Sequence, residues 1–551
     1  MSSLKIALLE LLPLALGTGV RSKICRHLGI SIVGGLTYSQ MLTLYITSVL
    51  YLDCFGLWLR GKRGGPGRRG LAPALIAAGT LALFTGCTVG PNYVRPPAEV
   101  PPAYKEMEGW KMGEPRDHLI RGAWWKIFNN PALNALEEKV NISNQNVAAA
   151  EAQFRQARAQ VEVAQAGYFP TVTSGASFTR SRSSSTLTNS FSSGTTVNDY
   201  LLPIDVSWAV DVWGRVRRLV EAGVASAQAN GADLEAIRLL AQAELAQDYF
   251  QLRVLDRQKK LLEETVVAYQ KSLQLTKNQY ASGVASKADV LQAETQLKTT
   301  QAQAIDVGVQ RAQTEHAIAL LIGRPASVFF IPVVPLNVSP PSIPIGIPSE
   351  LLERRPDIAA AERNMAAANA QIGVAIAAYF PTITLSATGG FESSSFSQWL
   401  SWPSRFWSVG PAISELLYEG GLRRAQTEAA RAAYDATVAS YRQTVLTGFQ
   451  EVEDNLAALR ILEEEARVQN EAVTAAQQSV IVTTNQYKAG TVSYLNVIVV
   501  QAAALSNEIT ALGILNRRMA ASVLLIQALG GGWSVSDLPS GDALKKIEEK
   551  K

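Results

Sequence analysis

The thiol of Cys87 is the side chain whose surroundings point most directly to a chemical reaction. It follows the apolar run Leu71–Phe84 and the small residues Thr85 and Gly86, and five basic residues precede that run: Arg60, Lys62, Arg63, Arg68 and Arg69. A basic segment, a short apolar run and small residues before a cysteine are typical of a lipoprotein signal peptide. Acyl chains on Cys87 would bind a membrane with about 0.8 kcal/mol per buried methylene. Phe84 stands where such signals usually have leucine, and an incidental cysteine after an ordinary signal peptide is the alternative.

No other side chains are spaced for catalysis or metal binding. The remaining cysteines and the histidines are scattered along the chain: Cys25, Cys54, His27, His118 and His316. Zinc sites need closely spaced pairs of such ligands. The net charge of +4 is spread over mixed signs, so no basic block indicates nucleic acid. We therefore expect no enzyme activity, no catalytic residue, no metal and no cofactor beyond a lipid on Cys87.

A tandem repeat organises the rest of the chain. The segment 166–173 (AGYFPTVT) returns as 377–384 (AAYFPTIT), and Asn-Gln-Tyr occurs at 278–280 and at 485–487. The Asn-Gln-Tyr pair and several glycines share a spacing of 207 residues, whereas the Tyr-Phe-Pro-Thr pair is 211 residues apart. The excess falls in the Ser/Thr-rich stretch 181–198, which is typical of a surface hairpin loop.

Each copy of the repeat contains two segments that alternate between apolar and polar residues. They begin at Val172, Leu202, Thr382 and Trp407, and the fourth is the weakest because it runs to Tyr418 through Glu415. The alternation predicts four strands in two hairpins with one apolar face. Four strands cannot close a barrel, and an open edge is not tolerated in lipid. Three chains that pool their strands would supply twelve.

Between the strands and the Asn-Gln-Tyr segments the chain is predicted to be helical. The stretches 214–282 and 421–489 contain no proline, so each can form one helix of about 100 Å. Shorter helices are expected over 131–168 and 284–322. Apolar residues near the end of each long stretch repeat every seven residues, as in a coiled-coil seam: Leu262, Val266, Tyr269, Leu273, Thr276 and Tyr280, then Leu462, Ala466, Val473, Val480 and Tyr487.

Three motifs resemble those of the outer-membrane efflux lipoproteins of RND systems, the OprM-like and NodT-like relatives of TolC. They are residues 87–97 (CTVGPNYVRPP), 124–133 (WWKIFNNPAL) and 348–358 (PSELLERRPDI). The resemblance implies an α+β membrane protein, a TolC-like trimer with a twelve-strand transmembrane β-barrel made from four strands per chain. It also implies a long periplasmic α-helical coiled-coil barrel and a mixed equatorial domain.

The first residues resemble a different family. Segments 12–19, 28–36 and 39–45 are similar to the C-terminal end of an RND inner-membrane pump. We interpret this region as a transmembrane fragment that arises from a fusion or a misplaced start, and a genuine extra anchor is the alternative. The expected segments are 1–59 pump-like fragment, 60–86 signal peptide, 87–130 N-terminal equatorial segment, 131–323 first repeat, 324–355 proline-rich connector without a core helix, 356–530 second repeat and 531–551 tail.

The resemblance places the working end at the helix-to-helix turns, where relatives dock onto a periplasmic membrane-fusion adaptor. The corresponding residues are Gly283, Val284, Ala285, Gly490, Thr491 and Val492. Glycine suits such a reversal because the turn often needs a positive φ. Relatives often carry acidic residues that narrow the pore just beyond. Asp289 and Asn496 are the candidates for that constriction, although Asp289 can equally serve as a helix-terminus residue.

These features predict the outer-membrane channel subunit of a tripartite efflux system. The predicted partners are two further copies of the chain, a periplasmic adaptor, an RND inner-membrane pump and outer-membrane lipid, with no nucleic acid. The predicted role is a passive exit duct for drugs or other small toxic compounds, lipid-anchored in the outer membrane and extending into the periplasm. Two alternatives remain, a type I secretion duct for polypeptides and a structural envelope coiled coil without a pore.

Overall fold

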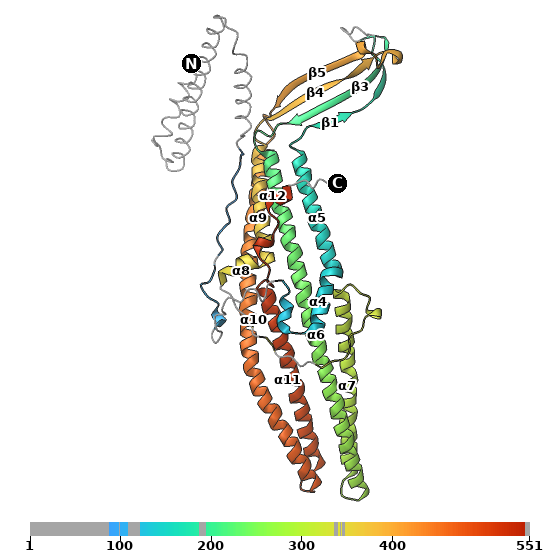
Figure 1. The fold of residues 1–551 in the computed structure, drawn as a ribbon, viewed down its shortest axis with the longest axis vertical. Coiled ribbons are helices and arrows are strands. Elements are labelled where there is room, and N and C mark those ends of the chain that lie inside the picture. The colour runs from blue at the N-terminus through green and yellow to red at the C-terminus, as the bar shows by residue number, and fades with distance from the viewer. Residues whose placement is uncertain are drawn as a thin grey trace, which may run out of the picture. The chain divides into compact units, whose positions relative to one another are not determined.

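The computed structural model describes most of the chain beyond the predicted signal peptide. The described residues are 88–98, 100–107, 122–186, 194–335, 340–341, 343 and 348–545. The pump-like fragment 1–59, the signal peptide 60–86 and Cys87 lie outside them. Within the described residues, long helices extend from one antiparallel sheet (Figure 1).

Two helical hairpins dominate the structure. Helix α6 (Arg215–Ala281) turns into α7 (Lys287–Leu321), and α10 (Leu422–Lys488) turns into α11 (Tyr494–Ala528). Helices α6 and α10 each have 67 residues, which is about 100 Å at 1.5 Å per residue. The two long helices predicted from the proline-free stretches are confirmed. Both turns lie at the end opposite the sheet (Figure 1).

The prediction of a single helix over 131–168 is wrong, because the chain forms two helices there, α4 (Pro131–Ser143) and α5 (Gln145–Ala166). Asn144 separates them with extended backbone at ψ 125°. Its side-chain oxygen accepts from the first free backbone N–H groups of α5, and its Nδ2 donates to the carbonyl of Leu321 at 2.7 Å. The asparagine therefore ends one helix, caps the next and ties both to the end of α7.

The connector between the repeats is also more helical than expected. Its last residues form α8 (Pro348–Arg354), in which Leu351 is buried. Pro356 then disfavours helical backbone at Arg355, so α9 (Pro356–Ala377) starts as a separate helix. The shorter elements are η1 (Lys105–Met107), η3 (Trp124–Phe128), η4 (Ala326–Val328), η5 (Phe396–Gln398), η6 (Trp402–Ser404), η7 (Val535–Asp537) and α12 (Gly541–Lys545).

The sheet contains the two predicted hairpins and joins them side by side. Its strands are β1 (Thr171–Ser174), β2 (Ser177–Arg182), β3 (Thr196–Ala209), β4 (Thr382–Ser393) and β5 (Arg405–Ser414). Strands β1 and β2 both pair with β3 and act as one interrupted strand, so the order is β1/β2, β3, β4, β5, all antiparallel. Strand β5 corresponds to the fourth predicted strand. It ends at Ser414, before Glu415, and is therefore shorter than expected.

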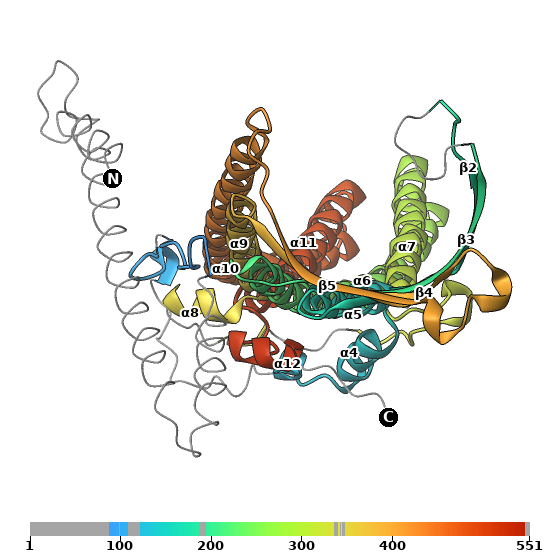
Figure 2. The same ribbon diagram turned by 90° about the horizontal axis from the view of Figure 1, so that it is seen from above.

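The largest core lies midway along the helices, where α6, α10 and α11 meet the short η3 segment. Trp124 and Phe128 of η3 are almost fully buried, and the ring of Phe128 lies 4.8 Å from that of Phe250 on α6. Seen along the helices, the sheet is curved, and α4, α8 and α12 lie on its convex side (Figure 2). The short elements therefore form a belt on one face of the helices.

One buried carboxyl group in this belt lacks a partner. Glu137 of α4 is fully buried, and neither of its oxygens has a hydrogen bond to any described residue. Burial raises the pKa of Glu137 well above its ordinary value. Since the folded state then holds the proton more tightly than the unfolded state, this group's contribution to stability is present below the unfolded pKa and is lost as the pH rises toward the folded pKa.

We expect hydrogen exchange at the amides of α4 to become faster, beyond the intrinsic pH effect, as the pH rises from 5 to 8. The loss can reach at most about 1.4 kcal/mol per pH unit for one proton. Glu137→Gln should remove this extra dependence and protect α4 at pH 8. Glu138→Gln alters an exposed neighbour and should leave the dependence unchanged. The same pH dependence in Glu137→Gln and in wild type would contradict the assignment.

Candidate functional site

The sheet presents apolar side chains on one face, and no second layer among the described residues covers them. One row across it contains Val172, Val206, Ala387 and Val409, and Trp407 lies on the same face opposite Gly389. Trp407 is 77% exposed and Val409 71% exposed. Exposed apolar surface costs about 25 cal/mol per Å² in water. This face therefore requires an apolar surrounding.

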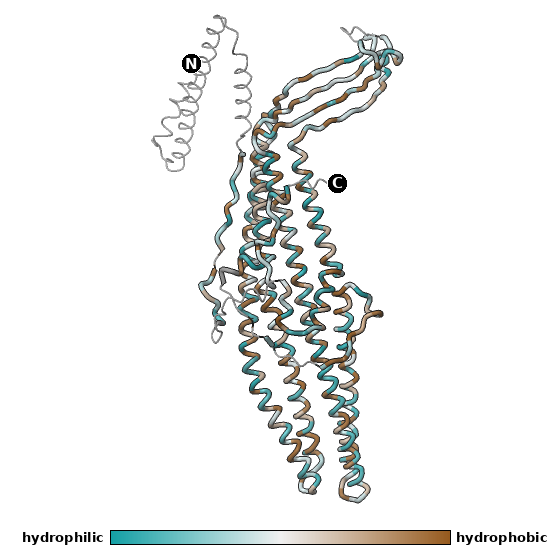
Figure 3. Tube along the Cα trace, in the orientation of Figure 1, coloured by the Kyte–Doolittle hydropathy of each residue, from teal (hydrophilic) through white to brown (hydrophobic). Residues whose placement is uncertain are grey.

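The opposite face is polar. The row next to the apolar one contains Thr173, Asp205, Thr388 and Ser408. The hydroxyl of Thr388 donates to a carboxylate oxygen of Asp205 at 2.7 Å. Figure 3 shows hydrophobic and hydrophilic residues interspersed along the strands, as this two-faced pattern requires. A one-layer sheet with an apolar and a polar face is the arrangement of a membrane barrel wall with a wet interior.

Both hairpin turns use a glycine with left-handed backbone. Gly283 has φ +78° and Gly490 has φ +75°. In each turn the glycine N–H and the next N–H donate back to the helix, Gly283 to Tyr280 and Val284 to Gln279 in the first copy. This pair of bonds is a Schellman motif, which closes a helix and reverses the chain. The second turn has the same bonds, so the predicted tip residues occupy two matched turns.

The tip surfaces are open to solvent. Val284 is 73% exposed, and Gly283, Gly490 and Thr491 are also exposed, whereas Ala285 and Val492 are partly buried. No atom lies within 4 Å of a side chain added at Gly283 or Gly490, apart from the glycine's own neighbours in the chain. The glycines are therefore required by backbone conformation, and the space around them is free for a partner.

After the two turns, the first residues of α7 and of α11 are capped differently. Ser286 and Asp289 form a capping box, in which the Asp289 carboxylate accepts from the Ser286 N–H at 2.9 Å and the Ser286 hydroxyl accepts from the Asp289 N–H at 3.2 Å. Ser493 and Asn496 occupy the equivalent positions without a side-chain cap. Asp289 thus has a structural role at the start of α7, and the constriction assigned to Asp289 and Asn496 stays a prediction.

A cluster of buried side chains joins the two hairpins just beyond the turns, and we call it the tip cluster. Its buried members are Tyr269, Leu273, Val290, Ala293, Leu297, Tyr487, Tyr494 and Val497. The Tyr494 hydroxyl shares a hydrogen bond of 3.0 Å with that of Ser272 on α6, and the Tyr487 and Tyr494 rings lie 5.2 Å apart. Burial raises the pKa of Tyr494 and of Tyr269, which keeps both phenols neutral.

Sequence reasoning found only part of this cluster. Tyr269 and Tyr487 belong to the predicted heptad seams, but the seams by themselves do not indicate that α6 contacts α11. Tyr494 was missed, although the first copy carries Lys287 at the same place in the repeat. That difference between the copies is the signal that could have revealed it.

Comparison with known proteins identifies this arrangement. The model of the outer membrane efflux protein family matches residues 136–324 and 347–531, more than half of the chain. The chain belongs to the outer membrane efflux protein family. A probable efflux pump outer membrane protein of Pseudomonas putida, TtgC, is 30% identical over 462 residues, which cover 83% of this chain and 95% of TtgC.

Solved channels of this family have the same fold. The outer-membrane channel OprN has a TM-score of 0.76 at 32% identity, covering 81% of this chain and 100% of OprN. The open state of the Neisseria gonorrhoeae channel MtrE has a TM-score of 0.71 at 26% identity, covering 81% of this chain and 98% of MtrE. The predicted TolC-like fold is confirmed. The protein is an outer-membrane efflux channel component that extends into the periplasm.

The comparisons also confirm the resemblance at the N-terminus. Residues 1–54 match the AcrB/AcrD/AcrF family model. Among the described helices, α11 is long and apolar enough to cross a membrane by length and composition, and an 18-residue window in it has mean hydropathy 1.6. Because α11 packs along α10 and contributes Tyr494 and Val497 to the tip cluster, we assign its apolar surface to helix packing in this channel.

We expect Gly283→Ala and Gly490→Ala each to destabilise its turn by roughly 1–2 kcal/mol, because an alanine in left-handed backbone is strained. Faster hydrogen exchange within four residues of the turn would report the loss. Gly308→Ala is the matched control, since Gly308 lies inside α7 with free space around it and should gain helix stability instead. Unchanged exchange at both tips would contradict this assignment.

Proposed function

We propose that three copies of this chain form a passive exit duct for drugs or other small toxic compounds. The observation that carries the proposal is the one-layer sheet with an apolar face and a polar face. Within the described residues, the outer side of β1/β2 and the outer side of β5 have no strand partner. A sheet edge in lipid must be paired, so neighbouring copies would complete a ring of twelve strands. Such a duct catalyses no reaction and needs no cofactor beyond a covalent lipid.

The two turns would dock onto a periplasmic adaptor, with an RND pump as the source of energy. The solvent-exposed Val284 and Thr491 and the matched glycine turns support this role for the tips. The match of residues 1–54 to the AcrB/AcrD/AcrF family favours an RND partner over the polypeptide exporter of a type I system. Asp289 and Asn496 would lie near the narrowest part of the resulting entrance.

The tip cluster would hold the entrance closed until docking shifts the hairpins apart. It joins side chains of α6, α7, α10 and α11 through buried rings and the Tyr494–Ser272 hydrogen bond. Opening would have to separate these contacts, so a partner that binds the separated hairpins more tightly would shift the population toward an open channel. The MtrE structure shows that a related channel has an open state.

Acylation of Cys87 would anchor the chain beside the membrane sheet. Thr88, the next residue, packs on Gly214, where an added side chain would lie 2.9 Å from the Thr88 Cα. The N–H of Val89 donates to the Trp213 carbonyl at 3.2 Å. This contact lies between the end of β3 and the start of α6, and a lipid attached at that level would reach the same membrane as the strands.

Single-channel recording in planar bilayers tests the duct. We expect the purified wild-type trimer to insert and conduct weakly, and Tyr494→Ala to increase conductance severalfold because it leaves a cavity in the tip cluster, typically at a cost of about 3–5 kcal/mol for a large ring. Tyr280→Ala is the control, since Tyr280 is 47% exposed and outside the buried cluster. Absence of conductance from inserted trimers of both wild type and Tyr494→Ala, or uphill drug transport by the protein alone, would refute the proposal.

Intact-mass analysis of the mature protein tests the anchor. We expect an acylated N-terminus at residue 87, and loss of the acyl mass in Cys87→Ser. Cys54→Ser should leave the acyl mass unchanged. A mature protein that begins upstream of Cys87 would exclude both the cleavage and the lipid.

A further inference from the structure

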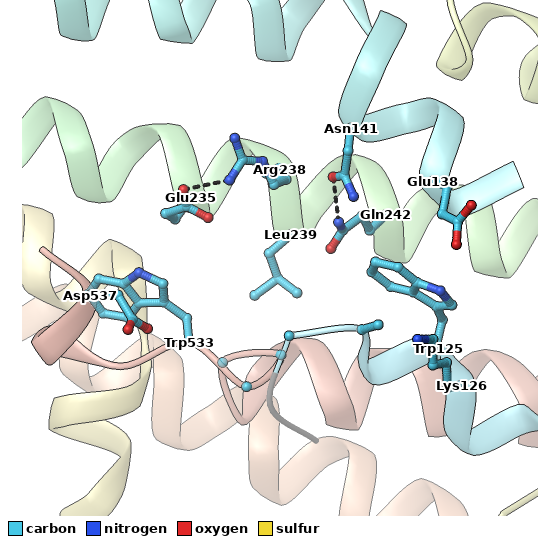
Figure 4. Close-up of a pocket in the computed structure, with 15 residues that line it drawn as sticks. Trp125, Lys126, Glu138, Asn141, Glu235, Arg238, Leu239, Gln242, Trp533 and Asp537 are labelled. Carbon is cyan, nitrogen blue, oxygen red and sulfur yellow. Dashed lines mark hydrogen bonds and ion pairs between the residues drawn. The ribbon is translucent and has the colours of Figure 1, made fainter. Parts of the chain in front are cut away.

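A cleft of about 750 Å³ lies beside α6, between the end of α4, the η3 segment and the chain that follows α11 (Figure 4). It is separate from the sheet and from the tips. Its position is in the belt of short elements on the convex side of the sheet, where α4 and α12 lie (Figure 2). In the proposed ring of three copies, the convex side would face outward into the periplasm, so the cleft would be reached from outside the duct.

Two tryptophans mark the ends of the cleft. Figure 4 shows Trp533 at one end and Trp125 at the other, with Leu239 between them. Trp533 is half-buried and offers ring surface to the cleft. Trp125 is buried, and its indole Nε1 has no hydrogen-bond partner in the described part of the chain. The half-buried ring of Trp533, beside polar side chains, suits a ligand with both apolar and hydrogen-bonding surface.

The wall between the tryptophans carries amide groups that are held in place. The Gln242 amide accepts from the Trp124 indole N–H at 3.2 Å and donates to the side-chain oxygen of Asn141 at 2.8 Å. Gln242 is buried, whereas Asn141 is exposed, so the bond from Gln242 orients the free Nδ2 of Asn141 toward a ligand in advance. Pre-oriented polar groups in a concave site provide specificity for a ligand.

Charges of both signs line the cleft and largely offset one another. Arg238 is paired with Glu235 at 2.6 Å, and the Asp537 carboxylate accepts from the Ser534 N–H at 3.0 Å. Lys126 and Glu138 contribute one further charge of each sign. Such a lining gives no strong attraction to an ionic ligand. It favours a neutral ligand that is rich in hydroxyl and amide groups.

We propose that this cleft binds a short run of N-acetylated amino sugars from a cell-wall glycan strand. A sugar ring has an apolar face for Trp533 and a rim of hydroxyl groups for the charged and amide side chains. An N-acetyl group matches the exposed amide of Asn141, which the buried Gln242 holds in place. Arg238 lies about 35 Å along α6 from its first residue, at 1.5 Å per residue. Since α6 runs from the sheet into the periplasm, lipopolysaccharide sugars on the far side of the membrane cannot reach this site. The choice of the cell wall as the source of the glycan therefore rests on the proposed function, which places the strands in the outer membrane and the helices in the periplasm.

Calorimetry with the tetramer of N-acetylglucosamine tests the ligand class, and cosedimentation with purified cell-wall sacculi tests its source. The full-length trimer would be used in a detergent without a sugar headgroup, which would otherwise compete. We expect wild type to bind both probes. Maltohexaose is a neutral sugar without N-acetyl groups, and we expect it to bind at least about tenfold more weakly than the tetramer. Trp533→Ala should weaken tetramer binding roughly tenfold, and Trp533→Phe should retain most of it.

Trp402→Ala is the matched control, because Trp402 is 72% exposed and stacks on Arg405 beside the sheet. It should bind both probes as wild type does. Conductance of each variant in planar bilayers shows that the trimer is intact and tests the duct separately. The proposal is overturned if an intact, conducting wild type binds neither probe, if maltohexaose binds equally well, if sacculi are not bound, or if Trp533→Ala binds as tightly as wild type.

Discussion

A sheet that meets lipid on one face cannot leave its edge N–H and C=O groups unpaired, because no water is available there to bond them. In this protein the two copies of the repeat each contribute one hairpin, and the pairing of β3 with β4 joins the hairpins into one wall segment. The long helices continue from the strands, so the repeat that builds the membrane wall also places two matched turns at the far end.

The two copies share this architecture but differ where they meet other parts of the structure. After α7, the chain is fixed by Asp256, which accepts from Arg311 at 2.8 Å and from the N–H of Val334 at 3.0 Å. The corresponding acidic residue in the second copy, Glu463, is 77% exposed at its side chain. There the chain turns away after α11 through residues 530–532, all glycines with positive φ, and forms the wall of the cleft instead. A repeated frame thus acquires distinct surfaces through local differences.

Much of the fold could be predicted from local patterns. Alternation gave the strands, the absence of proline gave α6 and α10, and glycine after Asn-Gln-Tyr gave the turns, because each of these signals acts within a few residues. The predictions that were wrong involve competition between neighbours. Asn144 interrupts an otherwise helical stretch because its side chain bonds both the next helix and the Leu321 carbonyl, which lies far away in sequence. No periodicity reports such a contact.

The sequence by itself determined the family, through motifs that resemble those of its members. It also determined the repeat, the two faces of each strand and the position of the hairpin turns, since residue spacing encodes backbone periodicity directly. Only the tertiary structure decided that Tyr494 reaches across to α6, that Asp289 is engaged in a capping box, and that two tryptophans more than four hundred residues apart share one cleft. Those relations depend on how helices are placed side by side, and that placement is set by the summed packing of many residues rather than by any one pattern.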